Sequence, residues 1–182
     1  MKPVRKTAKS TSVILPVGHS NRSLEDFVQL MKAHDVTRVL DVRTIPRSAH
    51  NPQYNRETLP QDLRQVDLSY EHMPGLGGLR HSARGSLNTA WCNAAFRGFA
   101  DYMQTPEFEA ALEELIEQAR KARLVIMCAE AVPWRCHRSL IADARTVRGN
   151  LCEHITSRTR RQPHRMTPFA QVRKGHLTYP SP

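Results

Sequence analysis

The stretch LVIMCAEAVPWRCHRSLIADA, residues 124–144, joins an apolar run to a segment that predicts the start of a helix. Its first five residues, 124–128, form a continuous apolar run of the kind found in strands that are buried on both faces. Residues 136–148 have helical spacing, and Gly149 is a typical helix stop. A strand, a loop and a helix in this order form the basic unit of a parallel sheet. The stretch therefore predicts an α/β domain with polar residues between strand and helix.

The same alternation of strands and helices extends outward in both directions. We expect further strands at 12–17, 37–43, 68–73 and 151–156, and helices at 23–34, 56–66 and 105–122. Ser23 and Thr105 are suitable helix caps, with Pro106 at the first helical position. Residues 74–95 are rich in glycine and predict a long loop. Together these elements predict a single three-layer α/β domain with a mainly parallel five-stranded sheet, Rossmann-like or rhodanese-like.

The basic charge of the chain lies at its two ends. The formal net charge is +10, yet residues 11–156 hold equal numbers of basic and acidic residues, 17 of each. We therefore divide the chain into a basic N-terminal arm (1–10), an α/β domain (11–156) and a basic C-terminal extension packed on the domain (157–182). Basic ends bind phosphate backbones, so nucleic acid is a candidate partner; solvated tails are the alternative.

The composition predicts a protein with reduced cysteines and without a membrane-spanning segment. The apolar runs are too short for a transmembrane helix, and VILPV near the start is too short for a secretory signal, so we expect a cytoplasmic protein without a membrane partner. Its four cysteines are then expected as free thiols: Cys92, Cys128, Cys136 and Cys152. No sequence feature indicates a particular cofactor or oligomeric state.

Polar residues follow three of the predicted strands at the point where each strand ends. His19 and Ser20 follow the first strand, Asp41 and Arg43 the second, and the segment after Cys128 the fourth. Ligands of parallel sheets bind beyond the carboxyl ends of the strands, which share one edge. We therefore expect these distant segments to form one site at that edge.

Two cysteines are the candidate nucleophiles of this site. Cys136 lies near a predicted helix start beside Arg135 and Arg138, where a thiol pKa is lowered, and Cys128 lies at a strand end. His19 or His137 would move protons. The alternative is that both cysteines are small buried apolar residues.

Charged residues complete the expected site. Arg43, Arg135 and Arg138 would bind an anionic group, Asp41 and Glu130 would orient these cations, and Ser20 would donate a hydrogen bond. An enzyme acting on a phosphorylated or nucleotide-like small molecule, or transferring sulfur, is the expected function. A structural ion pair and helix capping are the alternative roles, and a nucleic-acid-associated module or a thiol or metal sensor are the alternative functions.

Two specific chemistries fit the segment after Cys128 less well. The order strand, cysteine, loop, arginine, helix is similar to cysteine phosphatases and rhodanese-type sulfurtransferases. However, the segment between Cys128 and Arg135 is one residue too long for such loops and has no glycine, and Glu130 repels a dianion. A metal site would use both cysteines with His137 and His19. No C-x-x-C pair is present, and adjacent residues at a helix start point in different directions, so we expect no metal ligands.

Several long motifs occur in an order that resembles a known family, the domain of unknown function numbered 488. They are GHSNRSLEDFVQLMKAHDVTRVLDVRTIPRSAHNPQYNRETL, GLGGLR, FRGFADYMQTPEF and MCAEAVPWRCHRSLIAD, and the likeness continues to the closing GHLTYP. The resemblance implies a compact cytoplasmic α/β domain of bacteria and archaea and implies no reaction. The positions that match recurring family motifs are Gly18, His19, Ser20, Asp41, Arg43, Cys128, Glu130, Cys136, His137 and Arg138.

Overall fold

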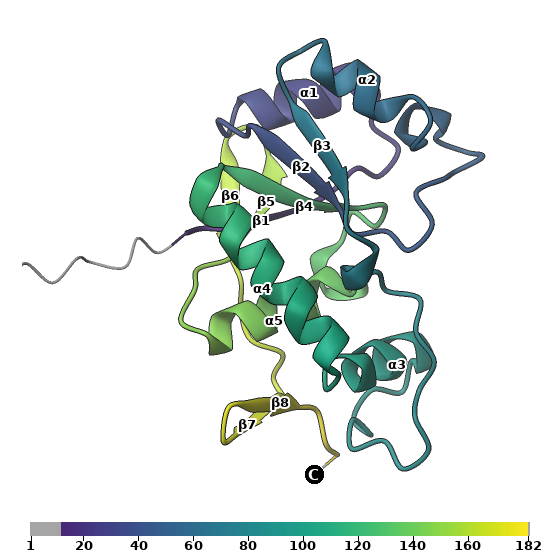
Figure 1. The fold of residues 1–182 in the computed structure, drawn as a ribbon, viewed down its shortest axis with the longest axis vertical. Coiled ribbons are helices and arrows are strands. Elements are labelled where there is room, and N and C mark those ends of the chain that lie inside the picture. Colours follow the sequence, from purple (N-terminus) through teal and green to yellow (C-terminus); the bar gives the residue numbers. More distant parts are fainter. Residues whose placement is uncertain (1–11, 182) are drawn as a thin grey trace, which may run out of the picture.

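The centre of the structure is a parallel four-stranded sheet, seen in a computed structural model that describes residues 12–181 (Figure 1). Its strand order is β1-β4-β2-β3. The strands of the chain are β1 (Leu15–Gly18), β2 (Arg38–Asp41), β3 (Ser69–His72), β4 (Leu124–Cys128), β5 (Glu153–Ser157), β6 (Arg160–Pro163), β7 (Gln171–Arg173) and β8 (His176–Thr178). The apolar run 124–128 is thus the inner strand β4, whose residues 124–127 are fully buried, as a strand between two covered faces requires.

Helices cover both faces of this sheet. They are α1 (Leu24–Lys32), α2 (Leu59–Arg64), α3 (Ala94–Tyr102), α4 (Pro106–Lys121) and α5 (Arg138–Val147), with short 3₁₀ turns η1 (Pro52–Tyr54), η2 (Pro74–Leu76) and η3 (Pro133–Arg135). Along β4, Val125 and Met127 belong to the core under α1 and α2, whereas Leu124 and Ile126 belong to the core under α3, α4 and α5. The alternation of side chains along a strand thus builds three layers, with α1 and α2 on one side of the sheet (Figure 1).

The expected helix signals are confirmed at atomic detail. The Ser23 side chain accepts a hydrogen bond from the backbone N–H of Asp26, and Thr105 Oγ1 accepts one from that of Phe108, so both residues cap their helices. Pro106 occupies the first turn of α4, where its missing N–H costs no intrahelical bond. Gly149 has a φ of 73° after α5, which is the left-handed conformation of a helix stop.

The register aligns the carboxyl ends of the four strands. Gly18 lies opposite Cys128, and Asp41 lies opposite both Met127 and His72. The backbone N–H groups of His19 and Ser20 continue the β1–β4 pairing by donating to the carbonyls of Cys128 and Ala129, each at 2.9 Å. The segments that follow β1, β2 and β4 therefore meet at one edge.

The expected fifth strand, 151–156, does not join the central sheet. β5 lies beside β1, but only one parallel bridge joins them, from Ile14 to Cys152. Ile14 uses its N–H and its carbonyl for this bridge, with Leu151 and Glu153. Alternate residues of a strand pair to the same side, so Pro16 would pair next, and it has no N–H to donate. β5 instead pairs antiparallel with β6.

The segment from 153 to 181 carries two antiparallel hairpins. The first is β5–β6, which spans the expected boundary at residue 156, and the second is β7–β8. Lys174 and Gly175 join β7 to β8 with positive φ angles, as a tight two-residue hairpin turn requires. After β8, Tyr179 is fully buried and its hydroxyl donates to Asp143 of α5 at 2.9 Å.

Three further observations complete the fold. Helix α3 forms at the end of the segment expected as loop; Asn93 caps it by accepting from the N–H groups of Ala95 and Phe96. The expected basic arm 1–10 lies outside the described residues. Within residues 12–181, no helix combines the length and apolar character needed to cross a membrane.

Candidate functional site

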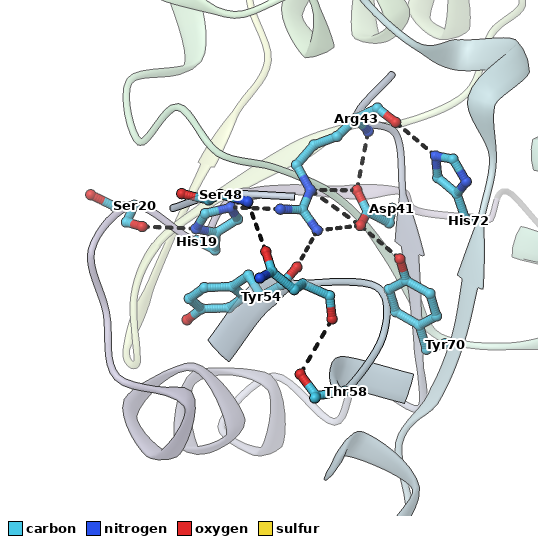
Figure 2. Close-up of polar contacts among 10 residues, drawn as sticks. His19, Ser20, Asp41, Arg43, Ser48, Tyr54, Thr58, Tyr70 and His72 are labelled. Carbon is cyan, nitrogen blue, oxygen red and sulfur yellow. Dashed lines mark hydrogen bonds and ion pairs between the residues drawn. The ribbon is translucent and has the colours of Figure 1, made fainter. Parts of the chain in front are cut away.

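A buried ion pair lies at the end of β2 (Figure 2). Asp41 is fully buried and accepts from Arg43 through Nε at 2.9 Å, Nη2 at 2.5 Å and the backbone N–H at 3.1 Å. Tyr70 of β3 adds a hydroxyl donor to Asp41 at 2.8 Å, and Arg43 Nη2 also donates to the carbonyl of Tyr54. These hydrogen bonds and the Asp41 charge raise the pKa of Arg43 despite its burial. The pair therefore neutralises itself within the protein.

His19 packs against this ion pair. Its ring stacks on Tyr54 with centroids 4.0 Å apart, Nδ1 lies 2.7 Å from the Ser20 carbonyl, and Nε2 lies 3.4 Å from Arg43 Nη1. The backbone carbonyl requires the proton on Nδ1, which leaves the Nε2 lone pair facing the arginine. Burial lowers the pKa of His19 from 6.5 to about 4, so the ring is neutral at pH 7. His19 thus helps to position Arg43 through the contact between its Nε2 and Arg43 Nη1.

The two cysteines of the opening stretch form a coupled thiol pair. The interaction between the two neighbouring thiols lowers the pKa of Cys136 well below its ordinary value and raises that of Cys128. Arg138 adds a donor from Nε to Cys136 Sγ at 3.1 Å, while its Nη2 donates to the Glu130 carbonyl. Hydrogen bonds to the charged form favour that form. The arrangement therefore favours a Cys136 thiolate beside a Cys128 thiol.

His137 turns back toward the same thiol pair. Its Nε2 lies 3.1 Å from the Val42 carbonyl and its Nδ1 lies 3.7 Å from Cys136 Sγ. Cys128, Cys136 and His137 offer ligand atoms that all lie within 4.8 Å of one another. Adjacent residues were expected to point apart, as they would on a helix. They converge because Cys136 is extended, with φ −133° and ψ 142°, and α5 begins only at Arg138.

A glycine makes room for this ring. A side chain at Gly78 would place its Cβ atom 2.5 Å from His137 Nδ1. Gly18 has the same role for the loop after β4, since its Cβ atom would lie 2.1 Å from the Glu130 carbonyl oxygen. Both glycines are therefore needed for close approach and not for unusual backbone angles.

The thiol pair lies in a cavity of about 410 Å³, which we term the cysteine cavity. Six of the expected site residues line it: Arg43, Cys128, Glu130, Arg135, Cys136 and His137. The other lining residues are Thr44, Ile45, Arg47, Ser48, Gly78, Leu79, Ala95, Phe96 and Ala129. This size and mixture of apolar and polar groups is typical of a small-molecule site.

The four remaining expected residues do not line the cavity. Arg138 reaches the site through Cys136 Sγ, whereas Asp41 and His19 reach it through Arg43. Ser20 has a φ of 54° and its hydroxyl donates to Asn21 at 3.3 Å. Of the three arginines expected to hold an anion, two are already bound to protein groups and only Arg135 is exposed.

The loop after Cys128 uses many of its own backbone donors. The N–H of Val132 donates to Glu130 Oε1 at 2.9 Å, that of Arg135 to the Val132 carbonyl, and that of Cys136 to the Pro133 carbonyl. A phosphate-binding loop instead turns its free amides toward the ligand. Three amides of this loop are therefore already used within the protein and are not available to bind a phosphate group.

Some cavity residues were not found by sequence reasoning. Thr44, Ile45 and Leu79 line the cavity but carry no chemical signature in the sequence. Tyr70 does not line it and reaches Asp41 only because β3 pairs with β2. The paired glycines of GLGGLR were a usable signal, because neighbouring glycines often mark a close approach to another segment. The partner of Gly78, His137, lies too far along the chain to be found this way.

The basic C-terminal extension contributes ion pairs to the body. Arg158 pairs with Asp26 of α1 at 3.0 Å, and Arg161 pairs with Glu153 at 3.2 Å. These two of the six basic residues beyond 156 thus have acidic partners on the domain. Nucleic-acid binding by this extension stays a prediction.

Comparison of the sequence with models of protein families gives one match. The sequence model of the family described as "Domain of unknown function DUF488" matches residues 23–145, about two thirds of the chain. The chain belongs to this family. The matched range holds every expected site residue except His19 and Ser20. Neither the curated proteins nor the solved structures contain a match, so a Rossmann-like or rhodanese-like relationship stays a prediction.

Proposed function

We propose that this protein is a thiol-dependent enzyme that transfers sulfur from an anionic small molecule through Cys136. The coupled thiol pair carries the proposal: the neighbouring Cys128 lowers the pKa of Cys136, Arg138 donates a hydrogen bond to Cys136 Sγ, and Cys136 lies in the wall of a cavity. A thiolate is the nucleophilic form of cysteine, and a neighbouring guanidinium stabilises it. Cys128 remains neutral and supplies a proton donor beside the attacking sulfur.

The chemistry of such a step is balanced for a thiosulfate-like donor. The Cys136 thiolate attacks the outer sulfur, the S–S bond of the donor breaks, and sulfite leaves with the bonding electron pair. Cys136 then carries a persulfide, whose outer sulfur an external thiolate or cyanide removes, and the Cys136 thiolate is restored. The exposed Arg135 lines the cavity and is available to attract the anionic donor and leaving group. Arg47 also lines the cavity, but it pairs with Glu57 at 3.5 Å.

Sulfur transfer is favoured over phosphate hydrolysis by the state of the loop. Several of its amides are bonded internally, and Arg138 is bonded to Cys136 and to the Glu130 carbonyl. A phosphoryl dianion would need these donors, together with a neutral Glu130 side chain nearby. Thiosulfate is also a dianion, but its attacked outer sulfur carries no oxygen atoms, so sulfur transfer needs a thiolate at the cavity wall and no cradle of loop amides around the reacting atom.

The test is persulfide formation followed by mass spectrometry of the intact and digested protein. After incubation with thiosulfate, we expect one added sulfur on Cys136, which C136S abolishes and cyanide removes. C92S and C152S are matched controls, because Cys92 is exposed, Cys152 is buried and neither is part of the pair. An unmodified Cys136, or equally slow labelling of all four cysteines by a thiol probe, contradicts the proposal.

A thiophilic metal site is the second candidate, and the convergence of Cys128, Cys136 and His137 favours it. Ligands of a tetrahedral zinc ion, at about 2.3 Å for sulfur and about 2.1 Å for nitrogen, lie about 3.6 Å apart. The 3.7 Å between Cys136 Sγ and His137 Nδ1 fits this spacing. His137 Nε2 is held by the Val42 carbonyl, which leaves Nδ1 free to bind a metal ion.

Cobalt(II) titration separates the two candidates. A metal site predicts one Co²⁺ per chain with sulfur-to-metal charge-transfer absorption, lost in C128S, C136S and H137Q but kept in C92S. Protection of both cavity thiols from labelling by stoichiometric Zn²⁺ supports the metal function. Persulfide formation without such absorption rules it out and supports sulfur transfer.

A further inference from the structure

The cysteine cavity has an apolar side that the thiol pair does not use. Four side chains from three segments form it, and we term them the apolar patch: Ile45 after β2, Leu79 after η2, and Ala95 and Phe96 in the first turn of α3. Ile45 and Leu79 are each 63% exposed. Single exposed apolar residues are common on protein surfaces, whereas several of them beside one cavity are typical of a ligand-binding groove.

Contacts outside the cavity hold the apolar patch in place. The backbone N–H of Leu79 donates to Thr44 Oγ1 at 3.0 Å, which ties the segment after η2 to the segment that carries Ile45. On the opposite wall, the Phe96 ring stacks on Trp91 with centroids 4.6 Å apart. The patch is therefore formed before a ligand arrives, as is usual for small-molecule sites.

The backbone donors of the apolar patch are already used within the protein. Helix α3 begins beside the cavity, but the Asn93 side chain accepts from the N–H groups of Ala95 and Phe96. The N–H of Leu79 is bonded to Thr44. These amides are not available to an anion, so we expect the charged group of a ligand on the other side of the cavity, where the thiol pair lies.

The charged groups of the cavity wall fit a ligand of low charge. Two of the three lining arginines, Arg43 and Arg47, are paired with carboxylates. In the described part of the chain, Arg135 forms no ion pair, so it is available to a ligand. Glu130 also lines the cavity, and the proposed nucleophile Cys136 is a thiolate. Repulsion from these two negative groups increases with the charge of the ligand, so a monoanion fits this wall better than a dianion such as thiosulfate.

We infer that the cysteine cavity binds an organic monoanion whose apolar group lies against the apolar patch. In the proposed sulfur transfer, on which this identity of the donor rests, the ligand is an organic thiosulfonate, R–SO₂–S⁻, in which an apolar group R replaces one oxygen of thiosulfate. The Cys136 thiolate attacks the outer sulfur, the S–S bond breaks, and the sulfinate R–SO₂⁻ leaves with the bonding electron pair. Cys136 then carries the persulfide already described, whose outer sulfur passes to an external thiolate or cyanide.

Two donors with the same charge and the same reacting group test the apolar patch. Benzenethiosulfonate and methanethiosulfonate differ only in R, and their rates with a free thiol in solution correct for the two leaving groups. Persulfide formation on the full chain, followed by mass spectrometry at increasing donor concentration, gives the half-saturating concentration of each donor. We expect this concentration to be lower for benzenethiosulfonate by about tenfold, the ordinary gain from placing an additional apolar group in a pocket.

Serine variants of exposed residues test which side chains cause this preference. I45S and L79S remove apolar surface from the cavity, and both side chains are more than half exposed, so we expect the fold to be kept. The double variant I45S/L79S should lose most of the preference for benzenethiosulfonate. L87S is the matched control, because Leu87 is 69% exposed and does not line the cavity.

Benzenesulfonate separates the choice of ligand from the reaction, because it keeps the ring and the charge but has no sulfur to transfer. On the unmodified chain it should bind more tightly than methanesulfonate by calorimetry and protect Cys136 from a thiol probe. Such binding without persulfide formation from any donor would refute sulfur transfer but support an apolar monoanion as the ligand.

The opposite result would overturn the inference and leave the proposed function standing. Persulfide formation with equal half-saturating concentrations of the two organic donors is one such result. Equal affinity for benzenesulfonate and methanesulfonate, or a full preference retained in a folded I45S/L79S variant, would also overturn it. Both ligand comparisons use the unmodified chain, so they decide the matter even if the double variant fails to fold.

Discussion

Replacement of Asp41 by asparagine should strongly destabilise the fold. The carboxylate is fully buried and is the counter-charge of Arg43, which is 6% exposed. The D41N variant keeps the size of the side chain but leaves the guanidinium buried beside a neutral amide. Breaking a buried pair from one side costs about 3–5 kcal/mol, because one charge remains uncompensated. That is a large part of the total stability of an ordinary domain, about 5–15 kcal/mol.

Urea denaturation followed by circular dichroism measures this cost. With a slope of about 2 kcal/mol per molar urea, the midpoint should fall by about 2 M. The pair Arg47 and Glu57 is the matched control, since it is 3.5 Å long and both side chains are more than half exposed. E57Q should change the free energy of unfolding by less than about 1 kcal/mol.

A double-mutant cycle tests the reasoning behind this number. R43Q should be destabilising for the same cause, because it leaves the Asp41 carboxylate buried without its cation. The double variant D41N/R43Q buries no charge, so it should be more stable than the sum of the single changes implies, by about 2–3 kcal/mol. Additive single changes, or a D41N cost as small as that of E57Q, would refute the view that burial and pairing dominate this site.

Three further predictions follow from the same geometry. G78A should displace the His137 ring, because the added Cβ atom would lie 2.5 Å from its Nδ1. The variant should lose any Co²⁺ charge-transfer absorption but keep its far-UV circular dichroism spectrum; retained absorption would contradict this. Burial lowers the pKa of His19 and His154 from 6.5 to about 4. Between pH 6.5 and pH 4 the unfolded chain therefore binds more protons than the folded chain, so the free energy of unfolding should fall as the pH drops through this range. The loss should be about 3 kcal/mol per histidine by urea titration, and H19Q should reduce it; a pH-independent stability in the window would count against burial of neutral rings. Burial raises the pKa of Cys152 to about 11, so this thiol should react with a probe only on unfolding, and fast native labelling would show that it is accessible.

Local sequence patterns were sufficient for the α/β class and for the meeting of the candidate site's segments at one edge of the sheet. The continuous apolar run of β4, the caps at Ser23 and Thr105, and the stop at Gly149 depend only on neighbouring residues, and all are found in the structure. The meeting of the segments after β1, β2 and β4 at one edge follows from parallel pairing alone, so it could also be predicted. These features have causes that act within a few residues or along a whole sheet.

Tertiary contacts decided how the polar side chains are used. Arg43 and Arg138 were expected to hold an anion together, but a guanidinium bonds to whichever acceptor lies within reach, here Asp41 and Cys136. The fifth strand is absent from the central sheet because Pro16 lacks an N–H on the side that β5 approaches, and that side is known only once β4 occupies the other. The convergence of His137 on the thiols likewise depends on Val42 and Gly78, which are distant in the chain. The direction of a side chain and its hydrogen-bond partners depend on distances between segments that are remote in the chain. Periodicity along the chain reports only on neighbouring residues, so these distances could not be predicted from it.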